Sequence, residues 1–191
     1  MGAASNPIAS EMAAGGALSA VLSTYPKVLI AAVHGANIGW GCTQLSAFDL
    51  VYAHGSSAFS QTPFASPGIV PEGGSSYNFP KSMGQRSANA LLLAGDKLSV
   101  QEAWVGGLVT GVVEAETREG FLAEVLKRAR RIGGYSGEAL QKAKKLTIEA
   151  SGDVEARREA GEREGRDLTV MFEREDTKRR LAAFGGRKAN I

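Results

Sequence analysis

Residues 28–33 form an uninterrupted apolar run, VLIAAV, which constrains the fold more than any other segment of the chain. A strand made only of apolar residues has both faces covered, as in parallel sheets flanked by helices. A second strand-forming stretch, DLVYAH at residues 49–54, follows a glycine-rich turn and a short segment that favours a helix. Two strands separated by a helical connection are typical of an α/β fold.

The other elements of the first 115 residues fit the same fold class. Residues 8–23 are rich in alanine and have apolar residues at helical spacing, which predicts a helix. Ser99 and Glu102 have the spacing of a capping box, which predicts a helix that continues through Val105. The pattern also predicts helices at 40–48 and 84–94 and strands at 58–60 and 108–113.

Charged residues are distributed unevenly along the chain. They are sparse up to Ala115 and dense from Glu116 to Arg180, which divides the chain into an α/β core at 1–115 and a helical region at 116–191. Alternating charges with apolar residues at helical spacing indicate helices whose charged faces are solvated. The expected helices span 116–132, 137–150, 153–173 and 176–184.

Composition excludes several kinds of site. The 191 residues include one cysteine, Cys42, and two histidines, so an internal disulfide is excluded and a His-rich metal site or Ser-His-Asp triad is disfavoured. No apolar run approaches ~20 residues, which predicts a soluble intracellular protein without a membrane span. The net charge of +2 argues neither for nor against nucleic acid. We expect His54 at a surface strand end and Trp104 in the core.

Two segments could carry chemistry. Between His34 and Cys42, glycines that follow a strand would let backbone N–H groups face a phosphate or a developing oxyanion, although a tight turn also needs small residues. The second segment, SPGIVPEGGSSYNFP, contains one carboxylate, Glu72. Apolar surroundings raise the pKa of a carboxyl group toward the range of a general base. Alternatively, Glu72 complements the N-terminus of a helix that begins near Gly73.

Four motifs in chain order resemble one family. They are KVLIAAVHGANIGWGC, FDLVYA, AFSQTPF and PEGGSSYNFP, and the later KLSVQEAWVGGLVTGVV fits the same family. The combination is similar to the crotonase, or enoyl-CoA hydratase/isomerase, superfamily, and looks closest to its peroxisomal Δ3,Δ2-enoyl-CoA isomerases. The resemblance implies a crotonase-like ββα spiral at 1–115 and a C-terminal helical oligomerisation region at 116–191. It also implies that the chain is N-terminally short, because relatives carry a preceding loop with a second oxyanion donor.

The resemblance assigns roles to individual residues. Hydratases of the family carry two glutamates at the positions that are Thr43 and Phe64 in this chain, so two-carboxylate water addition is not expected. In the isomerases a single base lies in the P-E-G motif, which here is Glu72. This base would move a proton from C2 to C4 of a 3-enoyl thioester. The backbone N–H of Trp40 would hold the enolate oxygen.

The resemblance also implies the substrate and its contacts. An acyl-CoA thioester would bind with its acyl chain near Phe64, Tyr77 and Phe79, and with coenzyme A near the basic residues Arg187 and Lys188. No cofactor is implied, because coenzyme A is part of the substrate. The family assembles as homotrimers or hexamers and implies neither nucleic acid nor a membrane as partner. The compartment, peroxisome or cytoplasm, stays open.

Two alternatives to an isomerase of fatty acid metabolism remain. One is a catalytically impaired or accessory crotonase-like protein that binds partners or acyl-CoA weakly. The other is a related acyl-CoA hydratase or isomerase step in secondary metabolism. Proton exchange at C2 of a bound acyl-CoA would separate an active site from a binding module.

Overall fold

The structure is a computed structural model, which describes the backbone of residues 7–188 and the side chains of residues 14–184. In the described range, six strands form two three-stranded sheets. The first sheet contains, in spatial order and all parallel, β1 (Ile30–Val33), β3 (Leu50–His54) and β6 (Gly111–Val113). In the second sheet β4 pairs in parallel with one neighbour and antiparallel with the other; its strands are β2 (Ala36–Ile38), β4 (Phe59–Gln61) and β5 (Leu98–Ser99).

The chain adds strands to the two sheets in pairs. Gly35, with φ +81°, forms the corner at which the chain leaves β1 and enters β2 in the other sheet. A helical segment, α2 (Trp40–Thr43) continued by a 3₁₀ turn (Gln44–Ala47), then leads into β3, and β4 follows in the second sheet. This repeat of two strands and a helix is the predicted crotonase-like spiral.

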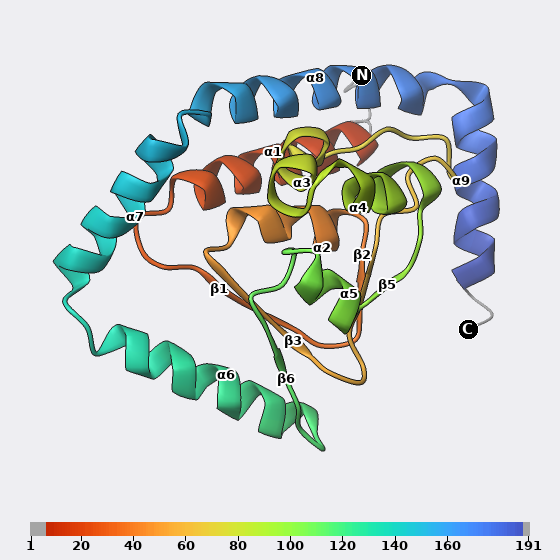
Figure 1. Ribbon diagram of the computed structural model, residues 1–191. Helices are drawn as coiled ribbons and strands as arrows, with labels where there is room; N and C mark the ends of the chain where they lie inside the picture. Colours follow the sequence, from red (N-terminus) through yellow and green to blue (C-terminus); the bar gives the residue numbers. More distant parts are fainter. Residues whose placement is uncertain (1–6, 189–191) are drawn as a thin grey trace, which may run out of the picture.

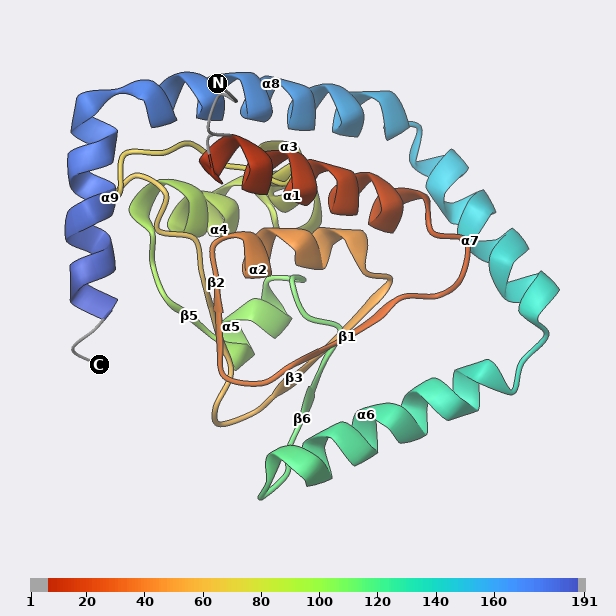
Figure 2. The ribbon, with the colours of Figure 1, turned by 180° about the vertical axis from the view of Figure 1, so that it is seen from behind.

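Helices surround these sheets (Figure 1). Those within the first 115 residues are α1 (Pro7–Thr24), α3 (Ser75–Met83), α4 (Gln85–Asn89), a π-helical turn (Ala90–Ala94) and α5 (Val100–Val105). The C-terminal helices are α6 (Arg118–Gly133), α7 (Gly137–Ser151), α8 (Val154–Glu173) and α9 (Glu175–Lys188). They run as an arc around the α/β part, as both views show (Figures 1 and 2). Within the described range 7–188, no helix is long and apolar enough to cross a membrane.

The main hydrophobic core joins both sheets to α2, α3, the π-helical turn and α5. Its aromatic members, Phe64 and Phe79, are 4% and 0% exposed. The predicted capping box is present at α5: Ser99 Oγ accepts from the Glu102 N–H, and the Glu102 carboxylate accepts from the Ser99 N–H at 2.8 Å. The sequence therefore predicted this helix start correctly.

Several expectations about elements are wrong in detail. Strands β2 and β5 were not expected, helix α3 was expected only in the alternative reading of Glu72, and the strand expected at 108–113 begins only at Gly111. The reason is that the N–H of Leu108 still bonds to the Ala103 carbonyl of α5, at 2.9 Å. The helix expected at 40–48 is α-helical only to Thr43.

Two side chains lie opposite to expectation. His54 is buried, because its Nε2 bonds the Ala115 carbonyl at 2.8 Å and its Nδ1 accepts from the Ser57 N–H. Trp104 is about half exposed, because α5 turns Val100 and Ala103 toward the core and leaves the next position outside.

Candidate active site

A glycine turn places one backbone N–H at the start of α2. Gly39 has φ +58°, a conformation that favours glycine, and its own N–H donates to the Gln61 carbonyl at 2.9 Å. The Gly39 carbonyl then accepts from the N–H groups of Cys42 and Thr43, at 2.9 and 3.0 Å, which begins the helix. No described residue accepts a hydrogen bond from the N–H of Trp40. This N–H is therefore available to an anionic oxygen.

Glu72 lies in the loop between β4 and α3, with its side chain turned toward α2. The Thr43 hydroxyl donates to Glu72 Oε1 at 2.8 Å. Burial raises the pKa of Glu72, the hydrogen bond from Thr43 lowers it, and the negative charge of Glu164 raises it further, to about 7. Near neutral pH this carboxyl group can therefore both take up and release a proton.

Two glycines bring Glu72 this close to α2. Gly73 and Gly74 have φ +68° and +75°, two successive left-handed residues that turn the loop directly into α3. A Cβ atom at Gly73 would lie 2.8 Å from Thr43 Oγ1, so only glycine permits the approach.

The structure combines both readings of Glu72. The residue does precede a helix, and its carbonyl accepts from the Ser75 N–H at 3.2 Å. Its carboxylate, however, hydrogen-bonds to Thr43 instead of to the first N–H groups of α3. Those N–H groups are bound by another carboxylate, Glu164 of α8, which accepts from Gly74 at 2.6 Å and from Ser76 at 2.7 Å.

Glu164 was missed by the sequence reading, which assigned the charges of this region to solvated faces. It is 6% exposed and lies on the buried face of α8. The signal that would have found it is the spacing of four residues between Ala160, Glu164 and Leu168, which places all three on one helix face.

The two hydratase positions hold no carboxylate in space either. Thr43 is fully buried and touches Glu72, whereas Phe64 packs in the main core. Phe79 is equally buried, and Tyr77 is half-buried with its ring centroid 5.9 Å from Lys81 Nζ. None of the three predicted acyl-contact residues lines either of the two cavities described next.

The cavities that open on the described surface include the following two. One, of about 280 Å³, lies between the ends of β2 and β4, the π-helical turn and Phe184 of α9. The other, of about 400 Å³, lies beside α3 and α8. Glu72 lines neither of them. Arg187 and Lys188, the predicted coenzyme A contacts, form the end of α9, and their side chains lie outside the described residues.

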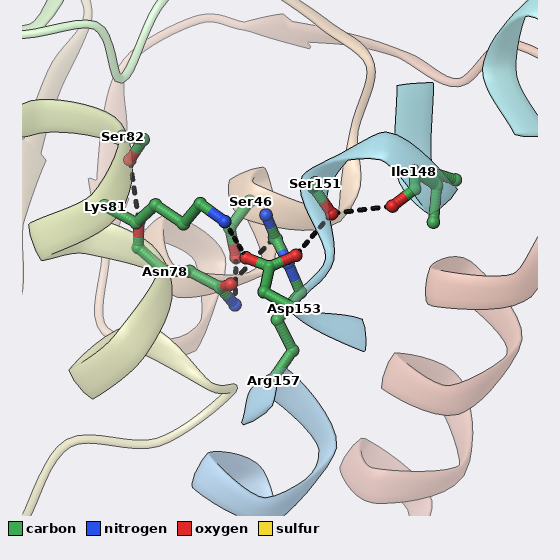
Figure 3. A network of polar contacts seen from close by, with 8 residues as sticks. All are labelled: Ser46, Asn78, Lys81, Ser82, Ile148, Ser151, Asp153 and Arg157. Atoms are coloured by element: carbon green, nitrogen blue, oxygen red, sulfur yellow. Dashed lines mark hydrogen bonds and ion pairs between the residues drawn. The ribbon is translucent and has the colours of Figure 1, made fainter. Parts of the chain in front are cut away.

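A buried ion-pair network fixes α3 to the start of α8 (Figure 3). Asp153 is 6% exposed and lies between Lys81 of α3, Ser151 and Arg157. Burial alone would raise the pKa of Asp153, but hydrogen bonds from Arg157, Lys81 and Ser151 outweigh it and hold the pKa well below its usual range. Arg157 also donates to the Asn78 side chain at 2.9 Å, so α8 contacts the middle of α3 as well.

The comparison with known families decides the assignment. The sequence profile of the family described as "Enoyl-CoA hydratase/isomerase" matches residues 7–189. The chain belongs to the enoyl-CoA hydratase/isomerase family. This is a family of enzymes. The two motifs singled out in the sequence contain the candidate base, Glu72, and the candidate oxyanion donor, Trp40.

Relatives of this chain include proteins that are named as isomerases. The chain is 41% identical over 122 residues to rat "Enoyl-CoA delta isomerase 2", covering 64% of this chain and 30% of the rat protein. It is 39% identical over 122 residues to mouse "Enoyl-CoA delta isomerase 3, peroxisomal", covering 64% of this chain and 37% of the mouse protein.

Solved structures agree with the fold. The crystal structure of an enoyl-CoA hydratase/isomerase from Pseudoalteromonas atlantica T6c superposes with a TM-score of 0.80 at 33% identity. The match covers 88% of this chain and 66% of that chain. The chain therefore spans about a third of the length of the rat and mouse isomerases, and about two thirds of the crystal structure.

Proposed function

We propose that the chain carries the base of an enoyl-CoA isomerase, which moves a double bond from C3 to C2 of an acyl-CoA thioester. The observation that carries the proposal is Glu72: a half-buried carboxyl with a pKa of about 7 and a single side-chain hydrogen bond, from Thr43. A base that accepts a proton at one carbon and returns it at another needs a pKa near the working pH. The isomerase names of the rat and mouse relatives support the same reaction.

The Thr43 hydroxyl suits both protonation states of Glu72. Its oxygen lies 2.8 Å from Glu72 Oε1 and 3.2 Å from the Trp40 carbonyl oxygen. A hydroxyl has one hydrogen to donate, so it bonds the ionised carboxylate before proton transfer. After Glu72 has taken the C2 proton, the acid donates to Thr43 Oγ1 and the hydroxyl turns to the Trp40 carbonyl. The same group thus stabilises both ends of the proton transfer.

Removal of the C2 proton puts negative charge on the thioester oxygen. The C3–C4 double bond becomes C2–C3 when Glu72 returns the proton at C4, so no oxidant or cofactor is needed. We assign the unpaired N–H of Trp40 as a donor to the enolate oxygen, because it lies at the start of α2 in the motif beside Thr43. An oxyanion donor of this kind contributes about 10²–10³ in rate.

The variant Glu72→Gln tests the base. It keeps the size of the side chain and an acceptor for Thr43 but cannot take the proton, so we expect conversion of a 3-enoyl-CoA to fall at least ~10³-fold. The measurement is the absorbance of the conjugated 2-enoyl thioester, together with deuterium exchange at C2. Glu116→Gln, at an exposed glutamate, is the matched control and should keep full activity.

The outcomes separate the candidate functions. Undiminished turnover in Glu72→Gln would overturn the assignment of the base. If the wild-type chain binds acyl-CoA without C2 exchange, the accessory function replaces the isomerase. Hydration of a 2-enoyl-CoA without isomerisation would point instead to another step on acyl-CoA.

The remaining parts of the proposal concern binding and assembly. We assign Arg187 and Lys188 to the phosphates of coenzyme A. Reversal of both charges should weaken acyl-CoA binding, and the affinity for acyl-CoA is the test.

A homotrimer or hexamer is supported by large apolar side chains that are exposed on two helices, Leu122 and Leu126 of α6 and Leu146 of α7. Light scattering would measure the oligomeric state. Peroxisome and cytoplasm are distinguished by imaging a tagged chain, the mouse relative being named as peroxisomal.

A further inference from the structure

The loop that carries Glu72 is held at both ends by the C-terminal helices. At its start, Thr177 of α9 donates from Oγ1 to the Gly68 carbonyl at 3.0 Å. At its end, Glu164 of α8 binds the N–H groups of Gly74 and Ser76. Both side chains are buried, at 1% and 6% exposure. The base therefore lies on a segment whose position depends on residues about a hundred positions further along the chain.

Glu164 takes the place of a cap that α3 lacks. The N-cap residue Gly74 has no side chain with which to satisfy the first N–H groups of the helix. A carboxylate that accepts two such N–H groups is also favourably placed toward the positive end of the helix. The other glutamates in the middle of α8 face solvent: Glu159 pairs with Arg163, and Glu162 pairs with Arg158. Glu164 differs from both in direction and in partner.

We propose that Glu164 is a positioning residue for Glu72: the carboxylate of Glu164, on α8, binds the first N–H groups of α3 and thereby fixes the place of the base. The proposal rests on the proposed function of Glu72 for its catalytic consequence, but not for its geometry. Glu164 does not touch the reacting atoms in this arrangement. It acts through the Gly73–Gly74 turn, which lies so close to α2 that a Cβ at Gly73 would collide with Thr43.

The groups around Glu72 make the direction of the effect predictable. From α8, Glu164 contributes a negative charge that raises the pKa of Glu72. From α2 come the Thr43 hydroxyl and the thiol of Cys42, which is neutral because burial raises its pKa to about 12. From α3 the first charged residue is Lys81, held by Asp153. Loss of the Glu164 charge, and exposure of the α3 N-terminus, both stabilise ionised Glu72 and lower its pKa.

The test replaces Glu164 by Gln, with Glu162→Gln on the exposed face of the same helix as control. The pKa of Glu72 is measured from its side-chain ¹³C carboxyl resonance, identified as the signal missing in Glu72→Gln. We expect Glu164→Gln to lower this pKa by about half a unit or more and Glu162→Gln to leave it unchanged. Glu164→Asp retains the charge and should keep the pKa near that of wild type. This arm needs no catalytic activity, so it stands if the proposed function fails.

Kinetics provide the second readout. In Glu164→Gln the acid limb of kcat/KM should move to lower pH, and kcat should fall about 10- to 100-fold with KM little changed. A purely structural role would reduce the amount of folded protein without moving the limb. The amide resonances of Gly74 and Ser76 report the two hydrogen bonds directly and should shift in Glu164→Gln but not in Glu162→Gln.

Three results would overturn the proposal. The first is a folded Glu164→Gln variant in which the pKa of Glu72 is unchanged. The second is an equal shift in Glu164→Gln and Glu162→Gln. If Glu164→Gln does not fold, a clear fall in the pKa of Glu72 in Glu164→Asp, which retains the charge, would count equally against it.

Discussion

At the scale of the residue, the contact between Thr43 and Glu72 links the two motifs of the site. The fully buried Thr43 hydroxyl donates to Glu72 and opposes the effect of burial on its pKa. Glu164 acts in the other direction, since its charge raises the same pKa. Thr43 and Glu164 therefore shift the pKa of Glu72 in opposite directions, and each side chain can be replaced separately.

Thr43→Val removes the hydroxyl and leaves a side chain of similar size. Because the hydrogen bond lowers the pKa of Glu72, its loss should raise that pKa above about 7. The acid limb of kcat/KM then moves to higher pH, and for a shift of about one unit the rate at pH 7 falls about fivefold, because the ionised fraction drops from about one half to about one tenth. The pH profile measures this, and Thr43→Ser, which keeps a hydroxyl, should stay close to wild type. An unshifted profile in Thr43→Val would contradict the role of the hydrogen bond.

At the scale of the element, the glycine turn before α3 fixes the position of the Glu72 carboxylate. Gly73 and Gly74 adopt left-handed conformations, and the Cβ position of Gly73 lies against Thr43. Gly152, at the end of α7, is left-handed as well, with φ +66°, but has no neighbour within 4 Å of its Cβ position. Alanine would therefore strain the backbone at either glycine, but would collide with the site only at Gly73.

Gly73→Ala should lower the free energy of unfolding by about 3 kcal/mol, because strain and collision add. Gly152→Ala, the matched control, should lower it by only about 1–2 kcal/mol, from backbone strain alone. Urea denaturation gives both values. In folded Gly73→Ala the displaced Thr43 should also reduce isomerisation, which Gly152→Ala should not do. Equal losses in the two variants would show that the close approach to Thr43 has no energetic consequence.

At the scale of the whole molecule, the C-terminal helices do more than cover the α/β part. Helix α8 contacts α3 at its N-terminus through Glu164 and at its middle and end through Arg157 and Asp153. Helix α9 adds the bond from Thr177 to the Glu72 loop. The helical region therefore positions the site from outside, whatever its part in assembly.

Asp153→Asn should weaken the attachment of α8 to α3. Removal of one partner from a buried ion pair leaves its neighbours uncompensated, so we expect a loss of about 2 kcal/mol at pH 7, given that Lys81 and Arg157 stay partly exposed. The depressed pKa of Asp153 means that its contribution is present above the unfolded pKa of about 4 and is lost as pH falls below it. The difference between variant and wild type, from urea denaturation, should shrink in acid. A constant difference would exclude this ion pair as its source.

The sequence by itself determined the fold class and the main candidates of the site. The apolar run at 28–33, the capping box at Ser99 and the charge pattern beyond 116 act through local periodicity and turn chemistry, and the corresponding elements are present. The resemblance to the crotonase family assigned Glu72, through its P-E-G motif, and Trp40, through its glycine turn. These residues were found because the features that mark them lie within a few positions of each other.

Only the tertiary structure decided what surrounds those candidates. His54 is buried because a carbonyl 61 positions away accepts its Nε2–H, and α3 is capped by a carboxylate 90 positions beyond Gly74. Glu72 turns to Thr43 because Glu164 already occupies the helix N-terminus. Such pairings depend on which elements pack together: the spacing around Glu164 indicates a buried helix face, but not the helix end that this face meets. The sequence thus identifies the candidate base, whereas its hydrogen bonds and its pKa depend on the packing of α2, α3 and α8.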